Sequence, residues 1–344
     1  MIKAGVIGAT GYAGAEVYRL LLSHPQVESI TVASVSYEGQ DIASIFQNFY
    51  QRGDSVLLSP EEVIDQSDVI FAGVPHGAAE GYAKLAYDQG KKFIDLGADF
   101  RLEDEAVYTK WYGCEYHHKQ LHEQAVYGLP EMNRERIRKA SIIGNPGCYP
   151  TSIALGLMPA MKQGLVDVRG MVIDSKSGVS GSGRGLSQTT HFPDCNEAFS
   201  PYKIGAHRHT PEIEQTLSQL CGQPVKVTFT PHLLPLNRGI VSTIYADFAP
   251  GVTLEQVRDA YEQAYREETF VRVLPAGQVA NLKWVRMSNY CDISLHEDAH
   301  TGKLIVVSTI DNTVKGTAGQ AIQNMNLMFG FGETEGLMAP PPAF

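Results

Sequence analysis

The sequence lacks long hydrophobic runs and is poor in positive charge. No stretch reaches the ~18 consecutive apolar residues of a membrane-spanning helix. The 28 lysines and arginines stand against 38 aspartates and glutamates, which gives a formal net charge of −10. This balance argues against nucleic acid as a partner, and an anionic substrate would need a local group of basic side chains. We therefore expect no membrane span and no nucleic-acid partner.

Cysteine is also sparse, with five residues in an odd, scattered set. Such a set is typical of free thiols in a reducing compartment rather than of a disulfide framework. The chain runs from Met1 directly into an apolar strand, so we expect no signal peptide and a cytoplasmic protein. A length of 344 residues is too great for one small core and predicts two domains.

Hydrophobic periodicity predicts a different pattern of secondary structure in each half of the chain. Up to about residue 150, short apolar strands alternate with helices, which predicts an α/β domain with a doubly wound parallel sheet. Beyond it, longer strands predict a mostly antiparallel sheet with a helix packed on it. The expected strands are 2–7, 29–33, 68–73, 93–96, 141–143, 171–174, 225–229, 239–248 and 304–309, and the expected helices are 13–22, 78–88, 254–266 and 317–329.

A glycine loop follows the first strand and opens the first helix. Its spacing is G-x-x-G-x-x-G, and the strand–turn–helix context is that of a dinucleotide site, where a pyrophosphate rests on the helix N-terminus. The alternative is a glycine-rich turn with no ligand. The residues predicted to contact a dinucleotide are Gly8, Thr10, Gly11, Tyr12, Ala13 and Gly14.

The second strand ends in Ser34-Val35-Ser36, without an acidic residue at its tip. A carboxylate at this place would hold the ribose hydroxyls of NAD, whereas hydroxyl groups accommodate a 2′-phosphate. Ser34 and Ser36 therefore favour NADP(H), although no arginine follows directly.

Cys148 lies in Pro146-Gly147-Cys148-Tyr149-Pro150, just before an apolar helical run. Pro150 suits the first helical position. A thiol at a helix N-terminus is more easily a thiolate, because the unpaired N–H groups and the helix dipole favour negative charge. We predict that Cys148 is a nucleophile, the alternative being a small buried hydrophobe.

Two histidines precede a second helix start, in His207-Arg208-His209-Thr210-Pro211-Glu212. Thr210 is the expected N-cap with Pro211 in the first turn. In an extended segment His207 and His209 point to the same side, and either one suits general acid–base work. The alternatives are a pair of surface histidines or half of a metal site.

Three further segments carry polar side chains. The loop 177–184 contains Ser180 and Arg184, which suit an anion unless the loop is only a flexible linker. Arg101 leaves the end of a predicted strand, where ligands of such sheets bind, although it could form a structural ion pair with Asp99. A further segment has spacing like that of a zinc site, with Cys114, His117, His118 and His122. It lacks a second pair of metal ligands at standard spacing, so we expect no metal.

The chain resembles the N-acetyl-gamma-glutamyl-phosphate reductase family, the NADPH-dependent enzymes of arginine biosynthesis. The resemblance rests on the glycine loop, on the cysteine and histidine segments and on further stretches that cover nearly the whole chain in order. These stretches are 74–77, 95–102, 127–131, 144–151, 177–184, 207–212, 229–232, 237–239, 289–292 and 311–312. Ser152 departs from the usual Gly or Ala, and the arginine often found near Ser36 is absent.

The resemblance implies a Rossmann domain over residues 1–148, joined by a C-terminal helix at 313–335. It implies a catalytic, substrate and oligomerisation domain over 149–312, with the semialdehyde dehydrogenase fold. It also implies a homodimer or homotetramer, a Cys148 thioester and His207, rather than His209, as the acid–base group. The implied substrate residues are Arg101, Asn145, Ser180, Arg184, Arg208 and Glu212, and Asn312, Lys315 and Gly316 would lie near the nicotinamide.

Two alternatives stay open at this point. A reductase of a homologous acyl phosphate, such as a carrier-linked aminoadipyl phosphate, would differ by few residues. A non-catalytic NADPH-sensing regulator would have lost the cysteine or the histidine, and both are present.

Overall fold

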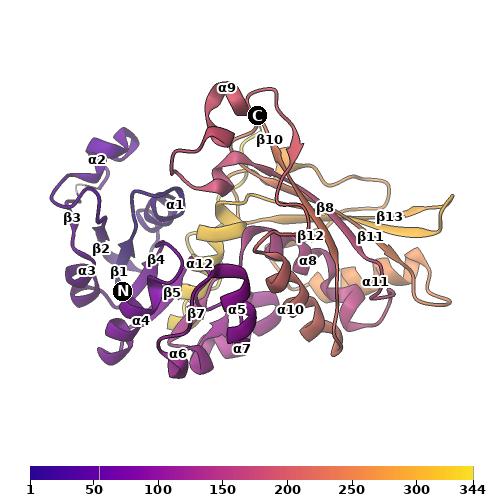
Figure 1. The fold of residues 1–344 in the computed structure, drawn as a ribbon, viewed down its shortest axis with the longest axis horizontal. Helices are drawn as coiled ribbons and strands as arrows, with labels where there is room; N and C mark the ends of the chain where they lie inside the picture. The colour runs from indigo at the N-terminus through magenta and orange to yellow at the C-terminus, as the bar shows by residue number, and fades with distance from the viewer. Residues whose placement is uncertain (54, 344) are drawn as a thin grey trace. The chain divides into compact units, whose positions relative to one another are not determined.

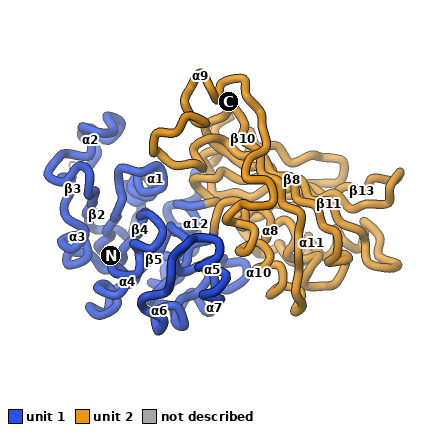
Figure 2. Tube along the Cα trace, viewed as in Figure 1, with its two compact units in different colours: residues 1–146, 317–339 blue, residues 147–316, 340–344 orange. Residues whose placement is uncertain are grey.

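The computed structural model describes residues 1–53 and 55–343. The chain divides into two compact units, which Figure 2 shows in two colours. Unit 1 comprises Met1–Pro146 and Thr317–Ala339, and unit 2 comprises Gly147–Gly316 and Pro340–Phe344. Each unit contains its own seven-stranded sheet. Among the described residues, no helix has the length and apolar character needed to cross a membrane.

The sheet of unit 1 is parallel throughout, in the order β3-β2-β1-β4-β5-β7-β6 (Figure 1). Its strands are β1 Ile2–Ile7, β2 Val27–Ala33, β3 Leu57–Leu58, β4 Val69–Ala72, β5 Lys92–Asp95, β6 Val126–Tyr127 and β7 Ile142–Gly144. Its helices are α1 Tyr12–Leu21, α2 Ile42–Ile45, α3 Pro60–Gln66, α4 Ala79–Asp88, α5 Glu105–Tyr112, α6 Lys119–Gln124, α7 Pro130–Lys139 and α12 Gly319–Phe329. The order reverses at β1, as in a doubly wound fold, so the α/β prediction is confirmed.

Unit 2 has a mixed sheet, in the order β12-β13-β14-β11-β8-β10-β9. Its strands are β8 Val172–Gly178, β9 Ser200–Pro201, β10 Thr228–Leu234, β11 Ile240–Asp247, β12 Val271–Val273, β13 Cys291–Asp298 and β14 Lys303–Ile310. Its helices are α8 Cys148–Lys162, α9 Phe192–Cys195, α10 Thr210–Cys221 and α11 Leu254–Tyr265. Four of the six strand pairings are antiparallel, and β10 with β8 and β12 with β13 are parallel.

Three predicted elements have wrong boundaries. The strand expected at 171–174 continues to Gly178. The strand expected at 225–229 begins only at Thr228, because it pairs with β8 from Val172 onward. The final helix begins at Gly319 and ends at Phe329, since a wide π turn over Val314–Ala318 precedes it. Neither the helix start at 317 nor the longer span 313–335 matches these bounds.

Helix α8 is buried along almost its whole length, which explains its apolar sequence. It packs on β11 and β14, where buried and half-buried residues alternate. Pro159 interrupts the helix and has no N–H for the carbonyl of Leu155. The buried hydroxyl of Tyr265 donates to that carbonyl at 2.5 Å, and Tyr261 donates to the next carbonyl, of Gly156, at 2.6 Å. Helix α11 therefore completes the hydrogen bonding of the helix that begins at Cys148.

Replacing Tyr265 by Phe should destabilise the protein by about 1–3 kcal/mol, because the Leu155 carbonyl is left buried without a donor. The measurement is the urea unfolding midpoint with its slope. Tyr50, which is 68% exposed, gives a matched Tyr→Phe control that should leave the midpoint unchanged. Equal midpoints for the two variants would contradict the assigned role.

Candidate functional site

Cys148 is the first residue of helix α8, and Gly147 is its N-cap. The predicted helix-start position is thus confirmed. Gly147 has no side chain that could cap the helix, and the helix dipole favours negative charge at this end. Pro150 lies at the third helical position rather than the first. A proline fits there because the amides of the first turn have no acceptor within the helix in any case.

Two side chains lie close to the turn before Cys148, the buried Glu212 and the half-buried His209. The carboxylate of Glu212 accepts the N–H of Gly147 at 2.7 Å, and no part of Glu212 is exposed. A Cβ on Gly147 would lie 2.7 Å from His209 Nε2, and a Cβ on Gly316 would lie 2.8 Å from Cys148 Cβ. The backbone approaches so closely on both sides of the cysteine that only glycine fits at these two positions.

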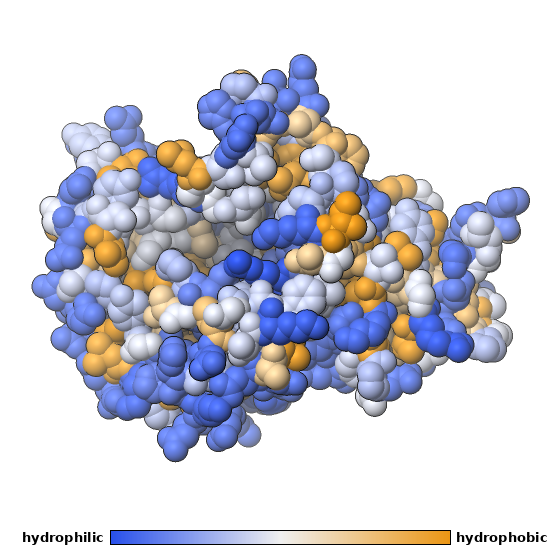
Figure 3. All heavy atoms as spheres, in the orientation of Figure 1, coloured by the Kyte–Doolittle hydropathy of each residue, from blue (hydrophilic) through white to orange (hydrophobic). Residues whose placement is uncertain are grey.

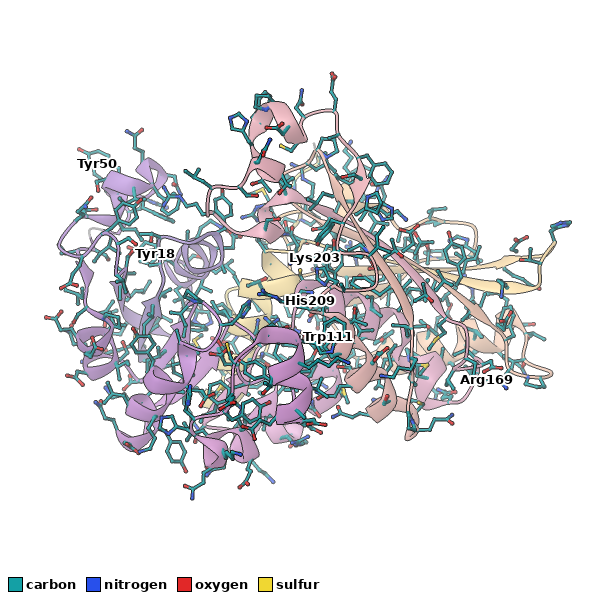
Figure 4. All side chains as sticks on the ribbon, viewed as in Figure 1. Tyr18, Tyr50, Trp111, Arg169, Lys203 and His209 are labelled. Carbon is teal, nitrogen blue, oxygen red and sulfur yellow. The ribbon has the colours of Figure 1, made fainter. Side chains whose placement is uncertain are left out.

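The histidine segment forms a turn and not an extended strand. The N–H of Thr210 bonds to the carbonyl of His207 at 3.0 Å, and His209 has helical backbone angles. His209 is therefore the N-cap of α10 and Thr210 its first residue, which corrects the predicted cap. Nevertheless the turn brings the rings of His207 and His209 together, with 5.0 Å between their centroids. Figure 4 labels His209 and Lys203, which belong to the same segment.

The hydrogen bonds of His207 define its tautomer. Its Nδ1 accepts the N–H of His209 at 3.1 Å, so the neutral ring carries its proton on Nε2. Nε2 lies 3.3 Å from the hydroxyl of Tyr202, which donates to Tyr149 at 3.2 Å. Burial, and next the positive charges of Lys203 and Arg208, lower the pKa of His207 to about 4. At neutral pH this ring is a neutral hydrogen-bond donor.

Sequence reasoning missed Tyr149 and Tyr202. Burial raises the pKa of both phenols, to about 12 for Tyr202, and the neighbouring Cys148 contributes to each shift. Their rings and that of Phe229 pack edge-on against His207. Tyr149 directly follows the cysteine, which is the only signal that the sequence offered for either residue.

Other predicted residues of unit 2 have roles within the unit. The amide of Asn312 donates to Ser180 at 3.0 Å and accepts the N–H of Gly239 at 2.6 Å, while the Ser180 hydroxyl donates to the carbonyl of Asn237. Lys315 is buried, with its ammonium group 5.7 Å from the centre of the Phe270 ring. Arg184 and Arg208 have exposed side chains.

The glycine loop in unit 1 has the shape of a dinucleotide turn. Gly8 has a φ of +80°, and a Cβ there would lie 2.2 Å from the carbonyl oxygen of Gly73. A Cβ on Gly14 would lie 2.3 Å from the oxygen of Gly8, and Gly11 is the N-cap of α1 with no side-chain cap. These glycines leave a close backbone approach at an uncapped helix start, which fits a pyrophosphate.

Hydroxyl groups occupy the tip of β2 beside this loop. The hydroxyls of Thr10 and Ser34 are 2.8 Å apart, and Ser34 is buried. Ser36, Tyr12 and the neighbouring Val35 are exposed, and Ala13 is half-buried. Residues 34–36, which follow β2 directly, include no acidic residue.

Arg101 and Asn145 are buried in unit 1. Arg101 donates from Nε to the carbonyl of Asn145 at 2.7 Å and from Nη2 to that of Leu96 at 3.0 Å. The amide of Asn145 donates to Thr317 at 3.0 Å and accepts from Asn324 at 3.1 Å. In this structure both side chains hold backbone or neighbouring amide groups in place.

Two buried carboxylates organise the same loops. Asp99 accepts the N–H groups of Gly77 and Ala79 and, at 2.7 Å, the hydroxyl of Tyr108. Burial, and next the charge of Asp99, raise the pKa of Asp95 to about 7. Asp95 still accepts the N–H groups of Gly97 and Asp99.

In the zinc-like segment His117 is exposed, Cys114 and His118 are half-buried, and the His122 side chain is buried. His122 stacks on Tyr116 and Phe100, and its Nε2 lies 3.1 Å from Glu80. Over residues 1–53 and 55–343, no group of three or more His, Cys, Asp or Glu side chains is arranged to hold a metal ion.

Family models and curated relatives that match this chain point to the same family. The semialdehyde dehydrogenase NAD binding domain matches residues 3–140, and the semialdehyde dehydrogenase dimerisation domain matches residues 148–312. Proteins named N-acetyl-gamma-glutamyl-phosphate reductase from Clostridium beijerinckii and Brachyspira hyodysenteriae are each 54% identical to this chain, over the whole of both chains. The chain belongs to the N-acetyl-gamma-glutamyl-phosphate reductase family. Its members are oxidoreductases of the semialdehyde dehydrogenase type, so the predicted family and enzyme class are confirmed.

Solved structures support the fold of this reductase family member. Aspartate semialdehyde dehydrogenase II from Vibrio cholerae matches 96% of this chain and 98% of its own, with a TM-score of 0.74 and 17% identity. Aspartate semialdehyde dehydrogenase with NADP from Candida albicans matches the same shares, with a TM-score of 0.72 and 20% identity. At such identities the likeness establishes the fold alone.

The neutral state of His207 predicts a stability that falls in acid. Because its pKa drops from 6.5 to about 4 on folding, the unfolded chain binds a proton between these pH values and the folded chain does not. The contribution of His207 is complete above pH 6.5 and is lost as the pH falls to about 4. Urea unfolding at about pH 7, 5.5 and 4.5 should show a weaker pH dependence for His207→Gln than for the wild type. Parallel pH profiles would contradict this assignment.

Proposed function

We propose that this protein reduces N-acetyl-gamma-glutamyl phosphate to N-acetylglutamate 5-semialdehyde and phosphate, the third step of arginine biosynthesis. The observation that carries the proposal is Cys148, the first residue of α8 in a chain of this reductase family. Tyr149 and Tyr202, which both interact electrostatically with Cys148, also pack against the ring of His207. The relatives at 49–54% identity bear the name of this reaction's enzyme. Cytoplasmic location is part of the proposal.

In the first step the Cys148 thiolate attacks the acyl carbon. The new C–S bond replaces the bond from carbon to the phosphate oxygen, and phosphate leaves with the bonding electron pair. The thiol proton passes to solvent beforehand, and the start of α8 stabilises the resulting charge. We assign the oxyanion of the tetrahedral intermediate to the N–H groups of Cys148 and Tyr149 at the start of α8.

In the second step the thioester carbon receives a hydride, which the bound nicotinamide cofactor supplies. The thiohemiacetal alkoxide then reforms its C=O bond, and the C–S electron pair returns to Cys148. The lowered pKa of His207 favours a neutral ring over a permanent ion pair with the thiolate. Its one N–H, on Nε2, would exchange its bond to the Tyr202 hydroxyl for a bond to the oxygen that carries negative charge. The relay through Tyr202 and Tyr149 orients the ring.

We assign the anionic groups of the substrate to two arginines. Arg184 and Arg208 have exposed guanidinium groups in unit 2 and suit the phosphate or the α-carboxylate. Arg101, Asn145, Ser180 and Glu212 stand in the same proposal as groups that shape the site, because their observed partners are protein atoms. No metal ion takes part in this scheme.

The cofactor we propose is NADP(H), held by the loop Gly8–Gly14. The hydroxyls of Thr10 and Ser34 and the absence of a carboxylate at the β2 tip support a 2′-phosphate in that place. Ser36, exposed at the same tip, belongs to this set. The proposed cofactor-binding set also includes Asn312, Lys315 and Gly316, from the turn that follows β14. In this turn Gly316 lies against Cys148.

We further propose a homodimer or homotetramer that forms through unit 2. The dimerisation domain of the family covers this unit. Alternate residues of its strands leave one sheet face half-buried, including Val241, Tyr245, Ile305 and Val307. In Figure 3 apolar side chains also gather on the surface over β10. A second copy of the chain would cover such a face.

The substrate proposal is tested by phosphate-dependent NADP reduction with N-acetylglutamate semialdehyde, run beside aspartate semialdehyde. We expect turnover of the first substrate, and a loss of about 10⁴-fold or more in kcat for Cys148→Ala and Cys148→Ser. Cys291→Ala changes a buried thiol away from α8's first turn and should leave the rate within a few-fold of wild type. Activity with aspartate semialdehyde alone would overturn the substrate, and an active Cys148→Ala would overturn the mechanism.

The cofactor proposal predicts that kcat/KM with NADPH exceeds kcat/KM with NADH. Placing a carboxylate at the exposed tip, in Ser36→Asp, should lower the NADPH/NADH ratio by about tenfold or more, because the new charge repels the 2′-phosphate. Ser36→Ala is the uncharged control. A clear preference of the wild type for NADH would refute the proposal.

A further inference from the structure

Glu212 is a buried carboxylate whose position is unusual for a residue beside a nucleophile. It lies in the first turn of α10 and has no exposed surface. Its Oε1 accepts the N–H of Gly147, the N-cap of α8, at 2.7 Å. The two residues are 65 positions apart in the sequence, so this bond joins the starts of two helices. It acts on the residue directly before Cys148.

The space around Gly147 shows that this contact is tight. Its φ of −67° suits any residue, so the backbone angle does not demand a glycine. A Cβ, however, would lie 3.0 Å from Glu212 Oε2 and 2.7 Å from His209 Nε2. Glu212 and the N-cap residue of α10 together enclose the turn, and the absence of a side chain on Gly147 permits that enclosure.

We propose that Glu212 is a positioning residue, whose carboxylate locks the Gly147 turn and thereby aims the Cys148 thiol. The inference rests on the proposed role of Cys148 as the nucleophile. In this role Glu212 has two effects on the Cys148 turn, which can be tested separately. Its oxygen holds the Gly147 N–H, and its negative charge opposes thiolate formation at the start of α8, where the helix dipole favours it.

His209 and Glu212 both approach the turn at Gly147, where a Cβ would lie 2.7 Å from His209 Nε2 and 3.0 Å from Glu212 Oε2. Behind them the rings of His207, His209, Tyr149, Tyr202 and Phe229 pack against one another. Lys203 and Arg208 are exposed on the segment before α10. Because burial keeps His207 neutral, removal of the Glu212 charge should be felt by the thiol directly.

The test separates charge from hydrogen bonding. Glu212→Gln keeps an oxygen for the Gly147 N–H and removes the charge. We expect the pH midpoint of Cys148 alkylation by iodoacetamide to fall by about one unit in this variant. Mass spectrometry reads the tryptic peptide 140–162, in which Cys148 is the only cysteine. Glu212→Ala removes the acceptor as well, and its kcat should fall by about 100-fold while KM changes little.

Glu214→Gln is the matched control. Glu214 lies two residues further along α10 and pairs with Lys226 at 2.6 Å, so its loss should leave the Cys148 midpoint unchanged. An unchanged or raised midpoint in Glu212→Gln would overturn the inference, as would a wild-type kcat in Glu212→Ala. If the Ala variant does not fold, the Gln variant still decides. The alkylation needs no substrate, so a failure of the reductase assay would overturn the proposed function without touching this result.

Discussion

The place at which α8 begins is the constraint on which the candidate site of unit 2 depends. Gly147 brings no side chain of its own, and Glu212, His209 and Gly316 close around it and Cys148. Further along the helix, Tyr265 and Tyr261 hold the carbonyls near Pro159. Helix α8 is thereby held at its start, through Gly147, and again at Leu155 and Gly156.

This constraint explains how charge is distributed in the site. A buried imidazole whose cation Lys203 and Arg208 also repel is a poor permanent cation, so the proposed Cys148 thiolate would need stabilisation by groups that do not titrate. The partial charges at the start of α8 meet that need, because they come with the backbone. His207 is then available as a neutral donor, with its ring held by the amide of His209 and the hydroxyl of Tyr202.

The features that were predicted correctly from the sequence depend mostly on nearby residues. The glycine loop, the strand β1 and the cysteine at a helix start depend on neighbours a few residues away, and these predictions match the structure. The errors lie where distant partners decide. Register with β8 sets the start of β10, and a turn at His207 makes His209 the cap of α10. The bond from Gly147 to Glu212 has no local signal at all, because its partners are far apart in the chain.

The difference between local and distant partners also matters for the group that would stabilise an oxyanion. Asn145 is attractive by sequence, but its amide is fully buried and already bonded to Thr317 and Asn324. Turning it toward a ligand would break buried hydrogen bonds at a cost of about 1–3 kcal/mol each. At the start of α8, Pro150 has no N–H and the N–H of Thr151 donates to the carbonyl of Gly147 at 2.9 Å, so the backbone donors of the proposed scheme are those of Cys148 and Tyr149. These backbone groups are a better source of transition-state stabilisation than Asn145, whose amide would have to give up buried hydrogen bonds.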